Sequence, residues 1–244
     1  MKVSATILQN SFGKYLKLAM DGKKIYIEKN SKPVALLKSL DEDDIFYMRE
    51  EAAEYVVPGR YSYEEYLEIA GEEETEKKYE LIDGQIYLMN SPFFKHQLAV
   101  NEIFGQFYNY FKGKPCIPLT APFDVKLHDE DKTFKEDPNV VQPDILVICD
   151  REMINEKGSY DGKPTLVVEV LSESTKSKDM MLKSNLYMRS GVLEYWIVDT
   201  DNRQVTVYSF EKNKLKSNKT FSKEEPVESF AFEGLAVETK GWLV

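Results

Sequence analysis

Two acidic residues stand in runs that are otherwise almost entirely apolar. Asp144 lies in the run 140–148 (VVQPDILVI), and Glu169 lies in the run 165–172 (TLVVEVLS). Short Val-, Ile- and Leu-rich runs bounded by Pro, Gly or Ser predict central strands of a sheet that is covered on both faces. A carboxylate inside such a strand loses its hydration, which is costly unless the group is paired or binds a metal. The two acids therefore predict hard oxygen ligands for Mg²⁺ or Mn²⁺.

Each acid also has an ordinary structural explanation. An isolated carboxylate in a strand can be satisfied by a neighbouring Lys or by backbone N–H groups, and perturbed carboxylates mark functional sites only statistically. Two such runs, with their acids 25 residues apart and each run followed by a polar or helical segment, favour the metal site. That hypothesis requires the two carboxylates to converge on one point, and it fails if a fixed internal cation fills the gap between them.

The segment after Glu169 supplies a cation. A helix is predicted from about residue 174 to 189, in which Asp179 and Lys183 are four residues apart and Tyr187 continues the same face. Because this helix follows the strand of Glu169, its first turns should pass near the end of that strand. Lys183 could there position an attacking water and offset the charge of a phosphate. The alternative is an ordinary surface ion pair with Asp179.

The composition is that of a folded protein. The chain has 244 residues, of which 42% are hydrophobic, so it can hold one large domain or two unequal ones. Its two cysteines, Cys116 and Cys149, occur in different contexts, which predicts no disulfide and a reducing compartment. No run approaches the roughly 20 apolar residues of a membrane span, and the N-terminus does not resemble a signal peptide. We expect a soluble cytoplasmic protein that does not enter a membrane.

The charge is divided unevenly along the chain. Residues 1–40 contain eight Lys and two acids, a net charge of +6, so the rest must carry −16 to give the overall −10. A basic head on an acidic body indicates that the head meets a polyanion. The acidic body does not exclude a nuclease, since metal-binding carboxylates themselves add negative charge.

Three segments are predicted. Residues 1–40 form a small αβ module with a helix followed by strands at 24–28 and 33–37, and they are too few for a self-sufficient core, which predicts dimerisation. Residues 41–60 begin with an acidic run and are interpreted as a linker or, alternatively, as a solvated helix on the body.

Residues 61–244 form the body. Its predicted elements are a helix capped by Ser62 with Glu65 in a capping box, a strand pair at 81–89 around Asp83-Gly84, a helix at 96–111, strands at 123–127, 140–148 and 165–172, the helix at 174–189, a strand at 194–198 and short strands from 205 to 244.

Several motifs of the body occur in the order expected for a known family. They are Tyr79-Glu80-Leu81-Ile82-Asp83-Gly84-Gln85-Ile86, Ser91-Pro92 with His96, Gln142-Pro143-Asp144-Ile145, Val168-Glu169-Val170-Leu171-Ser172, Asp179 with Lys183 and Tyr187, and the run 191–199. From about residue 61 to 243 the sequence resembles the Uma2 (DUF820) family of the PD-(D/E)XK nuclease superfamily. The resemblance implies an α/β (α+β) restriction-endonuclease-like fold, a mixed sheet flanked by helices.

The resemblance also implies site roles. Asp144 and Glu169 are expected to bind Mg²⁺, and Glu80 to contribute from the N-terminal side. Leu171 stands where the superfamily's motif has Lys, so Lys183 is interpreted as a migrated replacement; otherwise the domain is a degenerate nuclease. Glu80 could instead hydrogen-bond the turn that follows it. His96 could contact phosphate, although a histidine at a helix start is more often a packing or capping residue.

The head resembles a second family. Val3-Ser4-Ala5-Thr6, Asn10, Phe12-Gly13, Leu16, Gly22, Ile25-Tyr26-Ile27 and the run 30–37 are similar to the Phd/YefM antitoxin fold, whose members dimerise and bind palindromic operator DNA. The residues expected to contact DNA are Lys2, Ser4, Thr6, Asn10, Lys14 and Lys17, with His96 from the body. Gln9 and Ile7 depart from the family pattern, which weakens the expectation of sequence-specific reading.

Together these patterns predict a Mg²⁺- or Mn²⁺-dependent endonuclease acting on DNA. Its antitoxin-like head would bind DNA, and a homodimer would place two sites across a duplex. The sequence leaves open a separate toxin partner. Two other classes remain: a non-catalytic transcriptional regulator or antitoxin with a degenerate nuclease fold, and a protein-interaction module with buried structural acids.

Overall fold

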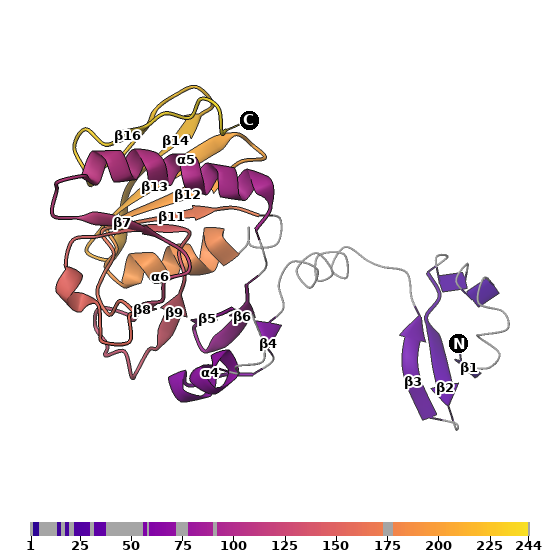
Figure 1. The fold of residues 1–244 in the computed structure, drawn as a ribbon. Coiled ribbons are helices and arrows are strands. Elements are labelled where there is room, and N and C mark those ends of the chain that lie inside the picture. The colour runs from indigo at the N-terminus through magenta and orange to yellow at the C-terminus, as the bar shows by residue number, and fades with distance from the viewer. Residues whose placement is uncertain are drawn as a thin grey trace. The chain divides into compact units, whose positions relative to one another are not determined.

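The computed structural model describes residues 2–4, 14–15, 18–19, 22–29, 32–37, 56–57, 59–71, 78–89, 92–172 and 178–243. The chain divides into two compact units, residues 1–52 and 53–244, which are described separately (Figure 1). None of the helices in the described ranges has the length and apolar character needed to cross a membrane.

The N-terminal unit contains a three-stranded sheet. Strand β1 (Lys2–Ser4) pairs in parallel with β2 (Ile25–Lys29), which pairs antiparallel with β3 (Lys32–Leu37). Strands β2 and β3 confirm the two that the sequence predicts, whereas β1 was not expected. Among the described residues of this unit, Val3, Tyr15, Ala19 and Ile25 form a buried cluster. The likeness to the Phd/YefM fold stays a prediction.

A six-stranded mixed sheet forms the centre of the second unit. Its order is β14-β13-β12-β11-β10-β7, with β11 and β12 parallel and all other neighbours antiparallel. Figure 1 shows α5 lying across one face of this sheet and α6 on the other. The bounds are β7 (Ile117–Thr120), β10 (Ile145–Ile148), β11 (Leu166–Val170), β12 (Glu194–Asp199), β13 (Gln204–Glu211), β14 (Lys214–Ser222), α5 (Phe94–Phe111) and α6 (Ser184–Arg189).

The central strands β10, β11 and β12 are buried on both faces, and their side chains alternate between two cores. Ile145 and Val147 of β10 pack in the cluster that contains α5, whereas Leu146 and Ile148 pack in the cluster that contains α6. A strand that is covered on both faces has a continuous run of hydrophobic residues. That is the pattern from which the sequence predicted strand β10. An acid within β11 or β12, such as Glu169 or Glu194, is therefore taken out of water.

A second sheet of five strands, β4-β6-β5-β9-β8, lies in the same unit. The bounds are β4 (Val56–Val57), β5 (Tyr79–Ile82), β6 (Gln85–Leu88), β8 (Val125–Leu127) and β9 (Asn139–Val141). Strand β4 falls within the predicted linker 41–60 and pairs with β6. The predicted boundaries at residues 40 and 60 stay a prediction. A short strand pair, β15 (Val227–Glu228) with β16 (Ala236–Val237), completes the unit.

One predicted strand is in fact two. The run 140–148 contains the end of β9 in the five-stranded sheet and all of β10 in the six-stranded sheet. Pro143 lies between them, and since proline has no backbone N–H it cannot continue a strand ladder. Asp144 consequently precedes β10 instead of lying inside a central strand, and its side chain is 18% exposed.

The predicted helix start at Ser62 and the predicted turn at Asp83-Gly84 are confirmed in the second unit. Helix α4 (Tyr63–Ala70) begins with the predicted capping box, in which Ser62 N donates to Glu65 Oε2 at 2.7 Å and Glu65 N donates to Ser62 Oγ at 3.2 Å. The turn between β5 and β6 has positive φ at Asp83 and Gly84, as two-residue hairpins require. The predicted helix 174–189 is seen as a π-helix, η2 (Lys178–Lys183), followed by α6; its start lies outside the described residues.

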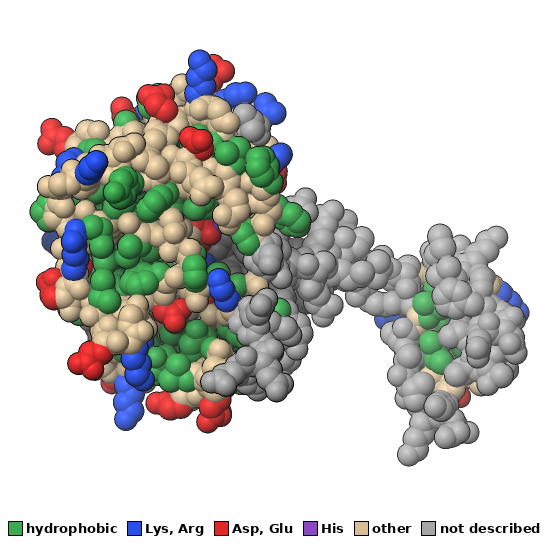
Figure 2. All heavy atoms as spheres, viewed as in Figure 1, with side chains coloured by type: hydrophobic (Ala, Val, Ile, Leu, Met, Phe, Trp, Pro, Cys, Tyr) green, Lys and Arg blue, Asp and Glu red, His purple; other side chains and the backbone are tan. Residues whose placement is uncertain are grey.

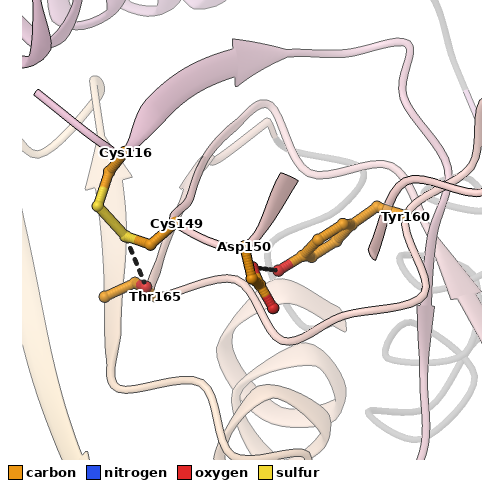
Figure 3. The surroundings of a disulfide bond; sticks show 5 residues. All are labelled: Cys116, Cys149, Asp150, Tyr160 and Thr165. Carbon is orange, nitrogen blue, oxygen red and sulfur yellow. Dashed lines mark hydrogen bonds between the residues drawn. A yellow bond between two sulfur atoms is a disulfide. The ribbon is translucent and has the colours of Figure 1, made fainter. Parts of the chain in front are cut away.

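The prediction that Cys116 and Cys149 would stay unpaired is wrong. They form a disulfide (Figure 3), and the hydroxyl of Thr165 lies 3.4 Å from the sulfur of Cys149. The reason is strand register: Ile117 of β7 pairs with Ile148 of β10, so the next residues outward face each other. The cysteine argument for a reducing compartment therefore loses its basis, and a cytoplasmic location stays a prediction.

A short 3₁₀ helix (Arg151–Met153) follows close to the disulfide. Asp150, which precedes this helix, accepts a hydrogen bond from the hydroxyl of Tyr160 at 2.5 Å.

Candidate active site

Asp144 and Glu169 are brought together by the pairing of β10 with β11. Ile145 is opposite Val168 in this antiparallel pair, so the register continued by one residue places Asp144 opposite Glu169. Side chains of directly opposed residues are neighbours on one face. The backbone N–H of Val170 donates to Asp144 Oδ2 at 2.8 Å, which fixes the aspartate beside the end of β11. The strand pairing therefore makes Asp144 and Glu169 neighbours, and the binding of one metal ion by both carboxylates stays a prediction.

A buried ammonium group joins two glutamates. Lys183 Nζ lies 2.9 Å from Glu80 Oε1 and 2.9 Å from Glu169 Oε1. The side chains of Lys183 and Glu169 are each 4% exposed and that of Glu80 is fully buried. An exposed ion pair is therefore ruled out as the role of Lys183. The side chain of Asp179, its suggested surface partner, lies outside the described residues.

Four elements hold this cluster in place. Glu80 is on β5, and its Oε1 also accepts a hydrogen bond from the backbone N–H of Gln142 at 3.0 Å. Lys183 is the last residue of the π-helix η2, a type of element that often occurs at functional sites. Tyr187, one turn later in α6, donates its hydroxyl to Glu169 Oε1 at 2.6 Å. In the turn after Glu80, which was its alternative partner, the N–H of Asp83 donates to Asn139 Oδ1 at 2.8 Å.

His96 approaches the aspartate from the opposite side of the sheet. Its Nε2 lies 3.1 Å from Asp144 Oδ2, and its side chain is 13% exposed. The other oxygen of this carboxylate, Oδ1, accepts no hydrogen bond from the described part of the chain. His96 thus orients Asp144, and contact with phosphate stays a prediction.

In the part of the chain that the structure describes, the cluster contains three carboxylates and one ammonium group. The ammonium of Lys183 forms ion pairs with Glu80 and Glu169, and Asp144 lies beside Glu169. Among the described residues no group of three or more His, Cys, Asp or Glu side chains is arranged to hold a metal. Two adjacent carboxylates nevertheless fit Mg²⁺, which binds through one or two carboxylates and keeps waters and substrate phosphates as its other ligands. The oxygen donors of Asp144 and Glu169 match that requirement.

Comparison with known proteins places the chain in a family. Residues 63–239 match the model of the Uma2 family, described as "Putative restriction endonuclease". The chain belongs to the Uma2 family. An uncharacterized protein of Synechocystis sp. is 30% identical over 150 residues, which cover 61% of this chain and 74% of that protein.

A solved structure shares the fold of this Uma2 protein. The crystal structure of a "putative nuclease belonging to DUF820" from Anabaena variabilis is similar with a TM-score of 0.56 and 22% identity. The similarity covers 75% of this chain and 99% of that one. The restriction-endonuclease-like fold predicted from the sequence is thereby confirmed. Membership of a nuclease family supports a nuclease as the general function.

The predicted DNA contacts of the N-terminal unit are only partly described. Lys2 and Lys14 are exposed, and so is Ser4. Lys2 Nζ lies 2.8 Å from Glu28 Oε1, and this hydrogen bond raises the pKa of Lys2. Lys14 lies 5.7 Å from the ring centre of Tyr15. Thr6, Asn10 and Lys17 lie outside the described residues.

Two partners in the Uma2 site were not predicted as site residues. In the sequence Tyr187 stands as the continuation of a helical stripe, four residues after Lys183, and as part of a family motif, without a predicted site role, yet it hydrogen-bonds Glu169. That spacing was the available signal. Gln142 acts through its backbone N–H on Glu80, for which a sequence offers no signal, because any residue except proline has that group.

Proposed function

We propose that the 53–244 unit is a metal-dependent endonuclease that hydrolyses phosphodiester bonds in DNA. The observation that carries the proposal is the opposed pair Asp144 and Glu169, held beside a buried Lys183 in a chain of the Uma2 family. Hard oxygen ligands next to a cation are the groups from which phosphoryl-transfer sites are built.

Asp144 and Glu169 would hold Mg²⁺ or Mn²⁺. When bound, such an ion acts as a Lewis acid at the phosphate and makes water a better nucleophile. The chain's own residues keep the two carboxylates in place: Val170 N–H and His96 bind Asp144, while Lys183 and Tyr187 bind Glu169. The ammonium of Lys183 also brings a positive charge to the position where a phosphate would gain negative charge.

Calorimetric titration tests the metal site. Mn²⁺ titrated into the wild-type protein should bind, and Asp144→Asn should weaken this binding by roughly tenfold or more. Glu228→Gln, which removes an acid whose side chain is 67% exposed, is the matched control and should leave the affinity unchanged. Equal affinity in wild type and Asp144→Asn would remove these residues from the proposal.

A cleavage assay tests the reaction. Single-stranded DNA, duplex DNA and RNA are incubated with Mn²⁺ and either wild type or Glu169→Ala. We expect the wild type to cleave DNA and the variant to leave it intact. Metal binding without cleavage of any of the three would favour the rival function, a DNA-binding regulator with a degenerate nuclease fold. The absence of a Lys at Leu171, where the superfamily's motif has one, is the observation that favours this rival.

The N-terminal unit is proposed to bind DNA and to dimerise. Support comes from the net charge of +6 on residues 1–40 and from the exposure of Lys2 and Lys14. The face of the 53–244 unit drawn in Figure 2 shows the described Lys and Arg side chains singly among acidic and apolar ones, not gathered into a patch. Replacing Lys2 and Lys14 by Gln should therefore weaken duplex binding and reduce its salt dependence. A separate toxin partner stays a prediction.

A further inference from the structure

Two adjacent phenylalanines are exposed at the start of α5. Phe93 is 80% exposed and Phe94 is 78% exposed, the largest exposed fractions among the described large hydrophobic residues. Phenylalanine is one of the residue types most often buried. The rest of α5 follows that rule, since Ile103 and Phe107 of the same helix are fully buried. The exposed pair therefore marks one end of an otherwise well-packed helix.

This end of the helix is next to the acids. Phe93 is the N-cap residue that precedes α5, Phe94 is the first residue of the helix, and His96 follows in its first turn. The Nε2 atom of His96 lies 3.1 Å from Asp144. The aromatic pair therefore lies two to three residues along the chain from a side chain that contacts the candidate active site.

The charges beside the pair suit a nucleotide. The first turn of α5 contains no acidic residue. Lys95 follows the two phenylalanines, is 61% exposed, and lies 3.9 Å from Asp201, at the limit of an ion pair. A nucleobase can stack on an exposed aromatic ring, and an adjacent lysine can bind a phosphate of the same strand.

We propose that Phe93 and Phe94 form a stacking platform for unpaired nucleobases of the strand that enters the acidic site. The proposal rests on the nuclease function proposed above and specifies its substrate. In a continuous duplex the faces of the bases are covered by their neighbours, and proteins reach only the base edges in the grooves. Unpaired bases expose their faces. The platform therefore selects single-stranded or frayed DNA over a continuous duplex.

A tryptophan placed in the platform reports stacking directly. The native Trp196 and Trp242 are buried, at 0% and 2% exposure, so they are shielded from a base that binds at the surface. We expect the fluorescence of a Phe93→Trp variant of the full chain to fall when a single-stranded oligothymidylate is added in the presence of EDTA. Tyr108→Trp is the matched control, because Tyr108 is 54% exposed and lies farther along the same helix. Its fluorescence should not change.

Affinity gives the second readout. Phe93→Ala should weaken binding of a fluorescein-labelled single strand by about tenfold, within the range measured for loss of one base–aromatic stack. Binding of the matched duplex, which includes any contribution from the N-terminal unit, should change less than about twofold. Because Phe93 is mostly exposed, the variant is expected to fold normally, and Tyr108→Ala controls for loss of an exposed ring.

The outcomes separate this proposal from the nuclease itself. Cleavage by the wild type combined with an unresponsive Phe93→Trp variant would overturn the platform and leave the nuclease standing. A responsive variant in a protein that cleaves nothing would do the reverse. A fluorescence change that follows protein concentration without DNA would assign the pair to contact with a second copy of the chain, and this result also overturns the proposal.

Discussion

Two buried glutamates on neighbouring parallel strands differ in the groups that bind their carboxylates. Glu169, near the end of β11, is bound by the ammonium of Lys183 and the hydroxyl of Tyr187. Glu194, at the start of β12, is bound by the indole N–H of Trp196, by Ser229 Oγ at 3.1 Å and by the N–H of Ala231 at 2.5 Å. Leu166 is the register partner of Glu194, and Glu169 lies three residues farther along, so the acids are at opposite ends of the strand pair.

The difference separates a site from a structural anchor. The donors to Glu194 are all neutral, and two of them come from the C-terminal segment, which this carboxylate fastens to the sheet. Glu169 is compensated by a charged group and has a second carboxylate, Asp144, on the adjoining strand. A buried acid with neutral donors is satisfied by the fold alone. Asp144 and Glu169 are neighbouring carboxylates, and the ammonium of Lys183 pairs with the second of them. The remaining charge of such a pair is what the proposed metal ion would compensate.

Replacing each glutamate by glutamine is the strongest way to test this contrast. Glu169→Gln should lower the rate of DNA cleavage in Mn²⁺ by roughly 10³-fold, about 4 kcal/mol in the activation free energy. Glu194→Gln should change the rate less than about threefold, because Glu194 lies away from the acids that face Lys183. Initial rates on a labelled oligonucleotide decide between them. Equal losses in the two variants would abolish the distinction.

The second test removes the cation. Lys183→Met leaves Glu80 and Glu169 buried without their counter-charge, and we expect the free energy of unfolding to fall by about 3 kcal/mol at neutral pH. Urea denaturation measures the change. Lys163→Met is the matched control, because its ion pair with Glu130 is partly exposed and should contribute less than about 1 kcal/mol. Adding Glu80→Gln to Lys183→Met should restore part of the loss; no recovery would mean that the charge is not the cause.

Much of this contrast could be predicted from the sequence. The apolar runs around Glu169 and Trp196 gave their strands, and Ser62 with Glu65 gave a helix start, because burial and capping act over short stretches of chain. The apolar runs also identified Asp144 and Glu169 as candidate site residues, and the resemblance to the family added Glu80; their metal-binding role stays a prediction. A cation from the helix after Glu169 was also expected, at Lys183.

Other features depend on contacts between distant segments. The run 191–199 shows Glu194 in the same apolar setting as Glu169, and only the donors from residues 229–231 reveal that it is structural. The disulfide between Cys116 and Cys149 follows from the pairing of β7 with β10, which local patterns do not specify. The division of 140–148 into two strands follows from the presence of a second sheet.

A third test concerns the anchor alone. Glu194→Ala removes the acceptor of three hydrogen bonds, and leaving buried donors unsatisfied should lower the free energy of unfolding by about 2 kcal/mol. The loss should be largest for the segment that Glu194 fastens. Amide hydrogen exchange should therefore become faster around residues 229–243 in the variant, while exchange in α6 beside the acidic site stays as in wild type. Uniform acceleration across the whole unit would argue against a local anchor.

The smallest expected effect is a pH dependence that the burial of Glu194 should produce. Burial raises the pKa of Glu194 above its usual value of 4.5, and the hydrogen bonds from Trp196, Ala231 and Ser229 only partly oppose this shift. Between the unfolded and folded pKa values the folded state binds more protons than the unfolded state. The free energy of unfolding must then fall as pH rises through that window, and the stabilisation by the protonated Glu194 is fully present only below the unfolded pKa.

The variants Glu194→Gln and Glu228→Gln test this. The decrease should disappear in Glu194→Gln, whereas Glu228→Gln, which removes an exposed acid, should keep it. Urea denaturation of the three proteins at several pH values above 4 measures the difference. A constant offset between wild type and Glu194→Gln would show that Glu194 is ionised equally in both states and would contradict the prediction.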